Sequence, residues 1–409
     1  MKQVEKHIIK QNNPIWQQID RLCFLSKNLY NYANYQLRQK FIFDSVYLGY
    51  NQLYHLVKET PDYRALPAKV SQQVLRSLDK NWKSFFEANK AYKLARLKFT
   101  GRPKLPRYKD KVKGRNLLVY TIQAISKPWL SKGIVKLSGT ELSIKTKVSV
   151  SDIHQARIVP QTGQYTIEVV YEKNENHTVT NLATVAAIDI GVNNLAALTS
   201  NKPGFVPVLV NGRPLKSLNQ FYNKTKAKLQ SQLAGDLQTS KRIQRLTANR
   251  NNRINSYLHS CSRWIINHLD KQGIGKLIVG KNPGWKQSVN LGSKTNQSFT
   301  TIPHHRFIEM LMYKGKLLGI EVIVREESYT SRASFLSLDP IPDYGDNIED
   351  VRFSGYREKR GIYKQLGNQT RINADVSSSY NIMRKAIPEI FDRRGIEGVV
   401  VRPVRVTPN

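Results

Sequence analysis

Asp189 is the acidic residue whose setting most favours chemistry. It lies in an apolar run over residues 184–190, which a polar turn at 191–194 breaks and residues 195–198 resume, so the pattern predicts two buried strands joined by a tight turn. A carboxylate in a central strand loses its hydration and needs hydrogen-bond donors, a cationic partner or a metal ion. In the alternative interpretation Asp189, next to Gly191, only orders the turn.

Three further carboxylates stand at the ends of predicted elements. Glu326 and Glu327 follow a predicted strand at 319–324, and Asp375 opens a predicted helix. Together with Asp189 these acids could converge, and their oxygens suit Mg²⁺, a hard cation. Two such ions would activate a water and stabilise the leaving oxygen of a phosphodiester. In the alternative interpretation Asp375 caps its helix and the two glutamates lie in an exposed turn.

The predicted elements around these acids alternate between strands and helices. Apolar runs at 205–210, 277–279 and 319–324 predict strands beyond the hairpin that carries Asp189, with helices between and after them. This order indicates an RNase H-like α/β core within a multidomain α+β protein.

The charge balance indicates a polyanionic partner. Lys and Arg number 65 against 30 Asp and Glu, which gives a formal net charge of +35. Contacts with nucleic-acid phosphates would neutralise this excess and make binding depend steeply on salt. We find no long uncharged apolar span and no signal-peptide pattern, so we expect a cytoplasmic, nucleoid-associated protein without a membrane partner. Cys23 and Cys261 are too few for a disulfide framework or a four-cysteine zinc site, and we expect ordinary buried or half-buried thiols.

Two basic stretches are candidates for nucleic-acid contact. Residues 97–109 mix prolines, which forbid a continuous helix, with cations and aromatic rings. Residues 213–270 predict a helical hairpin divided at Gly235, with an excess of cations that its own ion pairs cannot balance. Such a charge run can also be only a solvated face. With two residues of the loop at 280–287, the predicted contacts are Arg102, Lys104, Arg107, Tyr108, Lys109, Lys224, Lys228, Lys241, Arg242, Arg245, Arg250, Arg253, Trp285 and Lys286.

The N-terminal part of the chain predicts three kinds of structure. Residues 1–14 alternate as an edge strand does, and residues 15–94 have helical spacing, with Val74, Leu78 and Trp82 on one core-facing stripe. Short apolar runs separated by turns then predict a small β-barrel or sandwich.

Three motifs resemble the RuvC nuclease motifs of TnpB proteins, which are transposon-encoded relatives of the type V CRISPR effectors. They are Ala187-Ile188-Asp189-Ile190-Gly191 followed by Leu195-Ala196, Tyr329-Thr330-Ser331, and Asn373-Ala374-Asp375 followed by Tyr380-Asn381-Ile382. The segment 211–215 and the loop at 280–287 resemble one branch of that family. The resemblance is specific over about residues 184–387, and before that it rests on the order of elements and on composition.

The sequence departs from the family at the middle catalytic acid. Members usually place a Glu at the end of the strand equivalent to 277–279, where this chain has Gly280 and Lys281. Glu326 or Glu327 could supply the missing oxygen from the following strand. The alternation that continues from the valines at 322 and 324 slightly favours Glu326.

A second departure concerns zinc. Members of the family commonly carry a four-cysteine zinc ribbon before the last Asp, whereas residues 332–371 contain no cysteine. We therefore expect no zinc site, and any remnant of the ribbon must hold together without the metal.

The resemblance implies an RNA-guided DNA endonuclease. A guide RNA from the transposon end would select double-stranded DNA next to a short target-adjacent motif, and two Mg²⁺ ions held by Asp189, Asp375 and Glu326 or Glu327 would serve hydrolysis. Two alternatives stay open. The chain could be an RNA-guided DNA-binding protein that lost cleavage and acts as a repressor or transposition regulator, or a DNA-strand transposase.

The resemblance also implies a domain order. The expected domains are a wedge-domain strand at 1–14, a helical recognition domain at 15–94, a β-barrel wedge domain at 95–178, a RuvC-like core at 179–330 with a basic helical insertion at 213–270, a degenerate zinc-ribbon-like target-loading region at 331–371, a C-terminal core helix at 372–392 and a flexible tail at 393–409.

Overall fold

The computed structural model describes residues 1–174, 182–235, 237–282, 300–367, 369–391 and 399–408. The chain divides into two compact units, residues 1–173 and 174–409, and each contains both helices and strands. Cys23 and Cys261 are buried free thiols, as expected. None of the described helices has an apolar stretch long enough to cross a membrane.

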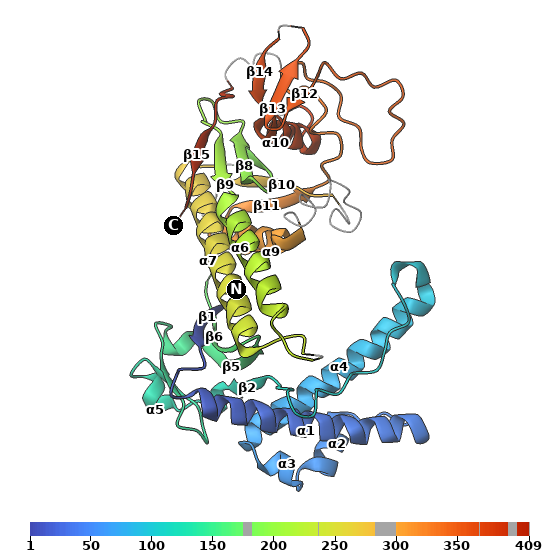
Figure 1. The fold of residues 1–409 in the computed structure, drawn as a ribbon, viewed down its shortest axis with the longest axis vertical. Coiled ribbons are helices and arrows are strands. Elements are labelled where there is room, and N and C mark those ends of the chain that lie inside the picture. The colour runs from blue at the N-terminus through green and yellow to red at the C-terminus, as the bar shows by residue number, and fades with distance from the viewer. Residues whose placement is uncertain (175–181, 236, 283–299, 368, 392–398, 409) are drawn as a thin grey trace. The chain divides into compact units, whose positions relative to one another are not determined.

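The first unit contains the predicted helices (Figure 1). The expected stripe of Val74, Leu78 and Trp82 is buried, and Trp82 Nε1 donates a hydrogen bond to Asn34 Oδ1 at 3.0 Å. The apolar faces therefore pack against one another, as the helical spacing predicts. The helices are α1 (Trp16–Phe43), α2 (Tyr50–Val57), α3 (Pro61–Arg64) and α4 (Ala68–Leu94).

The strands of the first unit form an open antiparallel sheet rather than a closed ring of hydrogen-bonded strands. Its order is β1-β6-β5-β2, so β1 and β2 are edges among the described residues. The predicted N-terminal strand pairs with β6 along its whole length. The members are β1 (Lys2–Ile9), β2 (Leu118–Thr121), β5 (Ile153–Gln161) and β6 (Gln164–Glu172); the helix α5 (Lys127–Leu130) and a two-stranded ribbon of β3 (Ile134–Lys136) and β4 (Ser143–Lys145) complete the unit.

A six-stranded mixed sheet forms the centre of the second unit (Figure 1). Its order is β11-β10-β7-β8-β9-β15; β7, β8 and β9 are antiparallel, whereas β10 runs parallel to both β7 and β11. The strands are β7 (Val185–Asp189), β8 (Asn194–Ser200), β9 (Val208–Asn211), β10 (Lys276–Gly280), β11 (Glu321–Arg325) and β15 (Val404–Val406). Every strand predicted for the core is present.

Helices cover both faces of this sheet. On one face α10 (Ala374–Ala386) packs with Ala187 and Ile278 in one apolar cluster. On the other face Ile188 and Leu277 pack with α7 (Lys241–Lys271) and α9 (His304–Leu317). Because β7 and β10 are buried on both faces, they read as continuous apolar runs.

The predicted helical hairpin is formed by α6 (Arg213–Gln230) and α7, which lie side by side in Figure 1. Arg250 of α7 bonds to Asn219 of α6, and Thr247 bonds to Tyr222 at 3.1 Å. Since earlier positions on α7 meet later positions on α6, the two helices are antiparallel.

The region before α10 contains a small antiparallel sheet, where the sequence indicates only an irregular segment and a remnant ribbon. Tyr363 and Ile372 are buried there beside Ala374, and Arg371 pairs with Glu358 at 2.9 Å. Hydrogen bonds and a small apolar cluster therefore hold this sheet. Its strands are β12 (Gly355–Lys359), β13 (Ile362–Gln365) and β14 (Arg371–Asn373).

The expectation of a flexible tail at 393–409 is wrong for residues 404–406. These residues form β15, which pairs in parallel with β9 and completes the edge of the core sheet. Three residues are too few to show a strand period, so the sequence pattern does not reveal this strand.

Candidate active site

β7 ends at Asp189 near the middle of the core sheet. Asp189 lies opposite Ala197 of β8, while the neighbour on the other side of β7 is β10. Val185 and Ala187 share the side of the strand on which Asp189 stands, and both pack in the apolar cluster that contains α10 residues. Asp189 therefore belongs to the α10 face of the sheet.

Asp375 lies in the first turn of α10 but does not cap the helix. The Asn373 side chain caps it, accepting hydrogen bonds from the backbone N–H groups of Asp375 and Val376 at 3.1 Å each. Asp375 Oδ2 instead accepts a hydrogen bond from Asn194 Nδ2 at 2.8 Å, and its Oδ1 lies 3.3 Å from Arg357 Nη2. The capping interpretation of Asp375 is therefore wrong.

Glu327 occupies the space that a side chain at Gly280 would fill. Gly280, the last residue of β10, is paired with Arg325, the last residue of β11. A Cβ added to Gly280 would overlap Glu327 Oε2 and would lie 2.5 Å from Ile382 Cδ1 of α10. The chain that leaves β11 thus brings a carboxylate back over the end of β10, beside the strand that carries Asp189.

Glu326 has a different partner. Its Oε2 lies 2.5 Å from the Lys385 Nζ of α10, and its Oε1 accepts a hydrogen bond from the Ser328 N–H at 2.6 Å. Strand alternation from Val322 and Val324 would place Glu326 on the same face of the sheet as Val322. That face is opposite to the one on which Asp189 stands, because Val322 packs with the α7 and α9 cluster rather than with α10. Of the two adjacent glutamates, the geometry brings Glu327 to Asp189.

The pKa values of these acids follow their surroundings. Burial, and then the charges of Glu327 and Asp375, raise the pKa of Asp189 well above its ordinary value, which Arg357 only partly opposes. Burial and the charge of Glu326 raise the pKa of Glu327 to about 7. Burial acts to raise the pKa of Glu326 too, but hydrogen bonds from Lys385 and Ser328 outweigh it and lower this pKa.

The carboxylates of Asp189, Glu327 and Asp375 are ligands of the type that a divalent cation prefers, but they are too far apart in this structure to bind one ion together. Glu327 Oε2 is buried and accepts no hydrogen bond from the described residues, and its charge disfavours ionisation of Asp189. A bound cation would relieve this repulsion and supply the missing partner. Among the described residues, no three His, Cys, Asp or Glu side chains lie close enough to hold one ion together. A shared ion therefore requires Asp189, Glu327 and Asp375 to move closer.

Exposed cations lie on both candidate nucleic-acid stretches. In the first unit the proline-containing stretch is held against α1, where Asn31 bonds to the backbone of Lys109 at 2.8 and 2.9 Å and Asn34 bonds to Pro106 O at 3.0 Å. The predicted contact residues of the stretch are exposed, although Arg38 lies over the Tyr108 ring at 4.7 Å and Lys109 Nζ lies 5.4 Å from the centre of the Tyr30 ring. The exposed members are Arg102, Lys104, Arg107, Tyr108 and Lys109 in the first unit, and Lys224, Lys228, Lys241, Arg242, Arg245 and Arg253 on α6 and α7.

Arg250 is the exception among the predicted contacts. Its guanidinium bonds to Asn219 Oδ1 at 2.8 and 2.5 Å, to Asn251 Oδ1 at 2.9 Å and to Thr301 O at 3.0 Å. It therefore joins α6 and α7 instead of standing free on the surface. The predicted contacts Trp285 and Lys286 lie outside the described residues.

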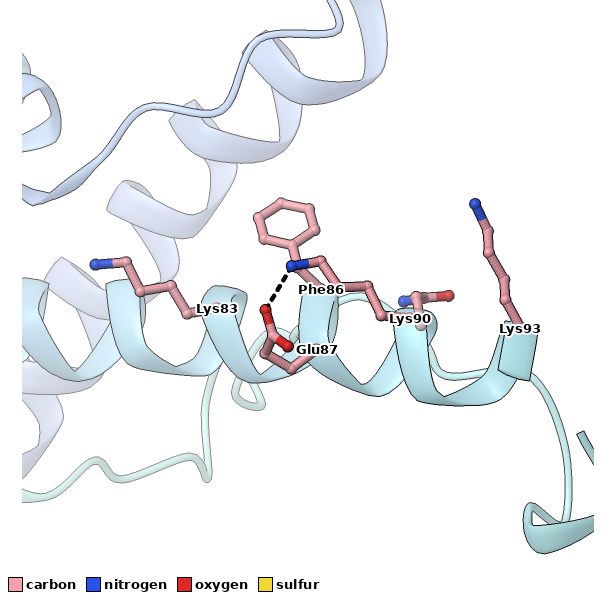
Figure 2. A pocket seen from close by; sticks show the side chains of 6 residues that line it. Lys83, Phe86, Glu87, Lys90 and Lys93 are labelled. Carbon is pink, nitrogen blue, oxygen red and sulfur yellow. Dashed lines mark hydrogen bonds and ion pairs between the residues drawn. The ribbon is translucent and has the colours of Figure 1, made fainter. Parts of the chain in front are cut away.

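The structure adds cations that the sequence analysis missed. Lys83, Lys90 and Lys93 of α4 line a hollow of about 460 Å³, and Figure 2 shows their side chains on one side of the helix. Lys90 pairs with Glu87 at 2.8 Å. Their spacing of seven and three residues places them on one face of a helix, which is the signal that could have revealed them.

Asn194, Arg357 and Lys385 were also missed at the acid site. Each of the three residues is separated in sequence from the carboxylate that it contacts, so a local sequence pattern does not predict the contact. Asn194 closes the predicted turn after Asp189, and its proximity to Asp375 emerges only when α10 packs on the sheet.

Comparison with known proteins finds a family model that matches part of the chain. The sequence model of the family OrfB_IS605, described as a probable transposase, matches residues 168–286. No curated protein sequence matches the chain.

Three solved structures give the comparison of fold. A cryo-EM structure of a Cas12f1–sgRNA–target DNA complex matches with a TM-score of 0.53 and 14% identity, over 90% of this chain and 83% of that one. A CRISPR-Cas12f ternary complex matches with a TM-score of 0.37 and 12% identity, over 90% and 82% of the chains. C2c1 of Alicyclobacillus acidoterrestris with single-guide RNA matches with a TM-score of 0.40 and 9% identity, over 93% and 68%. The likeness in fold rests on the first of these, since the other two TM-scores are below 0.5.

Proposed function

We propose that this chain, which resembles TnpB proteins and matches the OrfB_IS605 probable-transposase model over residues 168–286, is an RNA-guided DNA endonuclease encoded by an insertion sequence. The observation that carries the proposal is the position of Glu327, whose carboxylate fills the space over Gly280 and whose charge contributes to the raised pKa of Asp189. In this proposal the segment that follows β11 supplies the carboxylate that is absent from the end of β10.

In this function Mg²⁺ would be held by Asp189, Glu327 and Asp375, while Glu326 is the counterion of Lys385. Two Mg²⁺ ions bound there would supply an activated water and would neutralise charge on the leaving oxygen of the target phosphodiester. Asn194 and Arg357 orient Asp375 through the bonds at 2.8 and 3.3 Å. Placed on separate elements, these side chains can close around a phosphate group from several directions.

The partners follow from the exposed cations and the family. We propose that the core sheet and α10 form a RuvC-like nuclease core, that α1–α4 act in recognition, and that the sheet β1-β6-β5-β2 belongs to a wedge domain. A guide RNA from the transposon end and target DNA bearing a target-adjacent motif would bind the cationic surfaces of α6, α7 and the stretch at 97–109. The sheet β12–β14 would belong to the target-loading region.

Moving the acid back to β10 tests the proposal. Glu327→Gly should reduce guide-dependent cleavage by about 100-fold or more, because one carboxylate is lost from the site. Adding Gly280→Glu to that variant should restore part of the cleavage, since Glu327 no longer fills the space over Gly280 and only the end of the Ile382 side chain, 2.5 Å from the added Cβ, must shift. Normal cleavage by Glu327→Gly would contradict the assignment of Glu327.

One observation favours a second candidate function, that of a guide-dependent DNA-binding protein without cleavage. No three acidic side chains of the described residues gather closely enough for one ion. In that case the protein would act by occupying DNA, as a repressor or transposition regulator, and binding to matched DNA would be tight without any cut in the presence of Mg²⁺.

A further inference from the structure

Lys385 is a buried cation surrounded by oxygen atoms. Its side chain is 2% exposed, and its Nζ lies 2.5 Å from Glu326 Oε2 and 3.3 Å from Asp343 Oδ1. It also donates hydrogen bonds to Pro342 O at 2.7 Å and to Ser328 O at 3.0 Å. A buried ammonium is costly unless such partners surround it, so this arrangement is specific.

Two of these partners stand on either side of Glu327. Lys385 Nζ holds the side chain of Glu326 and the carbonyl of Ser328, so the backbone of Glu327 lies between two fixed points. The Glu327 N–H also donates to Asn282 Oδ1 at 3.0 Å. With its backbone held in this way, Glu327 directs its side chain toward β10.

The same helix secures the next part of the loop. Asn381 Nδ2 donates hydrogen bonds to Thr330 O at 2.9 Å and to Ala333 O at 2.7 Å, and Thr330 Oγ1 donates to Glu327 O at 2.8 Å. Because α10 also carries Asp375 in its first turn, one helix sets the positions of two of the three acids.

We infer that Lys385 is a positioning residue for the nuclease site: with Glu326 as its counterion, it fixes the backbone around Glu327 and so places the Glu327 carboxylate over Gly280. Lys385 itself touches neither substrate nor metal. This inference rests on the proposed function, in which Glu327 is a metal ligand.

A metal titration of the full-length chain tests this inference without relying on cleavage. Mn²⁺ serves as the probe, and electron paramagnetic resonance of the free ion gives its affinity. Lys385→Met should weaken Mn²⁺ binding about 10- to 100-fold, as is typical when a group that orients a ligand is lost. Glu326→Gln should weaken it in the same direction but less, because an amide still accepts a hydrogen bond from Lys385.

A second buried lysine provides the matched control. Lys314 of α9 is 3% exposed and donates hydrogen bonds to His259 O at 2.8 Å and to Ser262 Oγ at 2.7 Å. Lys314→Met should therefore lower the melting temperature yet leave Mn²⁺ affinity near that of the wild type. If Lys385→Met does not fold, as judged by circular dichroism, the comparison of Glu326→Gln with Lys314→Met decides.

The outcomes separate this inference from the proposed function. Glu327→Gln should weaken Mn²⁺ binding; if it does not, the role proposed for Glu327 fails and the inference fails with it. If Glu327→Gln weakens binding while Lys385→Met and Glu326→Gln bind Mn²⁺ as Lys314→Met does, Lys385 is only structural. In that case the inference is overturned and the proposed function stands.

Discussion

Gly280 and Glu327 fit together at the end of β10 because one has no side chain and the other fills the vacant space. The contact joins the last residue of β10 to the segment that follows β11, and the Ile382 side chain of α10 lies on the other side. The absence of a side chain at 280 is thus a requirement for the position of Glu327, since any Cβ there would displace the carboxylate.

Gly280→Ala should reduce cleavage strongly while guide-dependent DNA binding remains. The added methyl group would push Glu327 Oε2 from its place, and a displacement near 1 Å at a catalytic group is worth roughly 100-fold in rate. Cleavage and binding of matched DNA would be measured in parallel. Gly367→Ala is the control, because an added Cβ there meets nothing within 4 Å. Equal cleavage by both variants would contradict the close fit.

The positions of Asp189 and Asp375 could be predicted from the sequence, because Asp189 lies at the end of an apolar strand pattern and Asp375 lies at the start of a helical pattern. The choice between Glu326 and Glu327 could not, because strand alternation is a guide only within a strand and β11 ends at Arg325. The contacts of Lys385 are formed by packing of segments about 40–60 residues apart, which a sequence pattern does not encode.

At the scale of elements, the helical hairpin shows that similar cations have different tasks. Arg250 bonds across to α6, whereas Arg242 near the start of α7 is exposed. The spacing of charges predicts both helices but cannot tell a structural arginine from a free one, since the difference depends on Asn219 of the partner helix.

Substitutions at these two arginines should therefore have opposite effects. Arg250→Gln should lower the melting temperature and leave the salt dependence of DNA binding unchanged, because its hydrogen bonds hold α6 to α7. Arg242→Gln should leave the melting temperature unchanged and reduce the slope of log affinity against log salt by about 1. Thermal melts and fluorescence anisotropy across salt concentrations would check both. The reverse pattern would show that Arg250 contacts nucleic acid.

In the first unit an ion pair links α1 to the strands. Asp20 accepts two hydrogen bonds from Arg115 at 2.8 Å and one from Tyr165 at 2.6 Å. The hydrogen bond from Arg115, and then that from Tyr165, lower the pKa of Asp20 despite its partial burial. A lowered pKa in the folded state means that this stabilisation is complete above the unfolded value of about 3.9 and is lost as the pH falls through the folded value.

Asp20→Asn should consequently be less stable than the wild type at pH 7, and the difference should shrink below about pH 4. Urea unfolding at a series of pH values from 2 to 7 would measure it. A difference that stays constant over this range would show that the carboxylate charge of Asp20 does not stabilise the fold.

At the scale of the whole molecule, the net charge and the order of elements are independent features of the sequence. The net charge of +35 indicates a polyanionic partner before any element is known, and exposed cations lie on both units. The order of strands and helices predicts the core sheet, while the strands β12–β15 escape prediction because they lack an apolar run, as in Gly355–Lys359, where three of the five residues are charged.

We propose that the relocated carboxylate of Glu327 makes this protein a guided, metal-dependent nuclease. The most direct test is cleavage of a plasmid that carries a guide-matched target, by protein co-purified with its transposon-end RNA, in Mg²⁺ and in EDTA. We predict that the matched plasmid is cut in Mg²⁺, whereas an unmatched plasmid and the EDTA reaction remain intact. Tight, guide-dependent binding of the matched plasmid without cutting in Mg²⁺ would contradict the claim, because Glu327 would then not replace the carboxylate missing at Gly280.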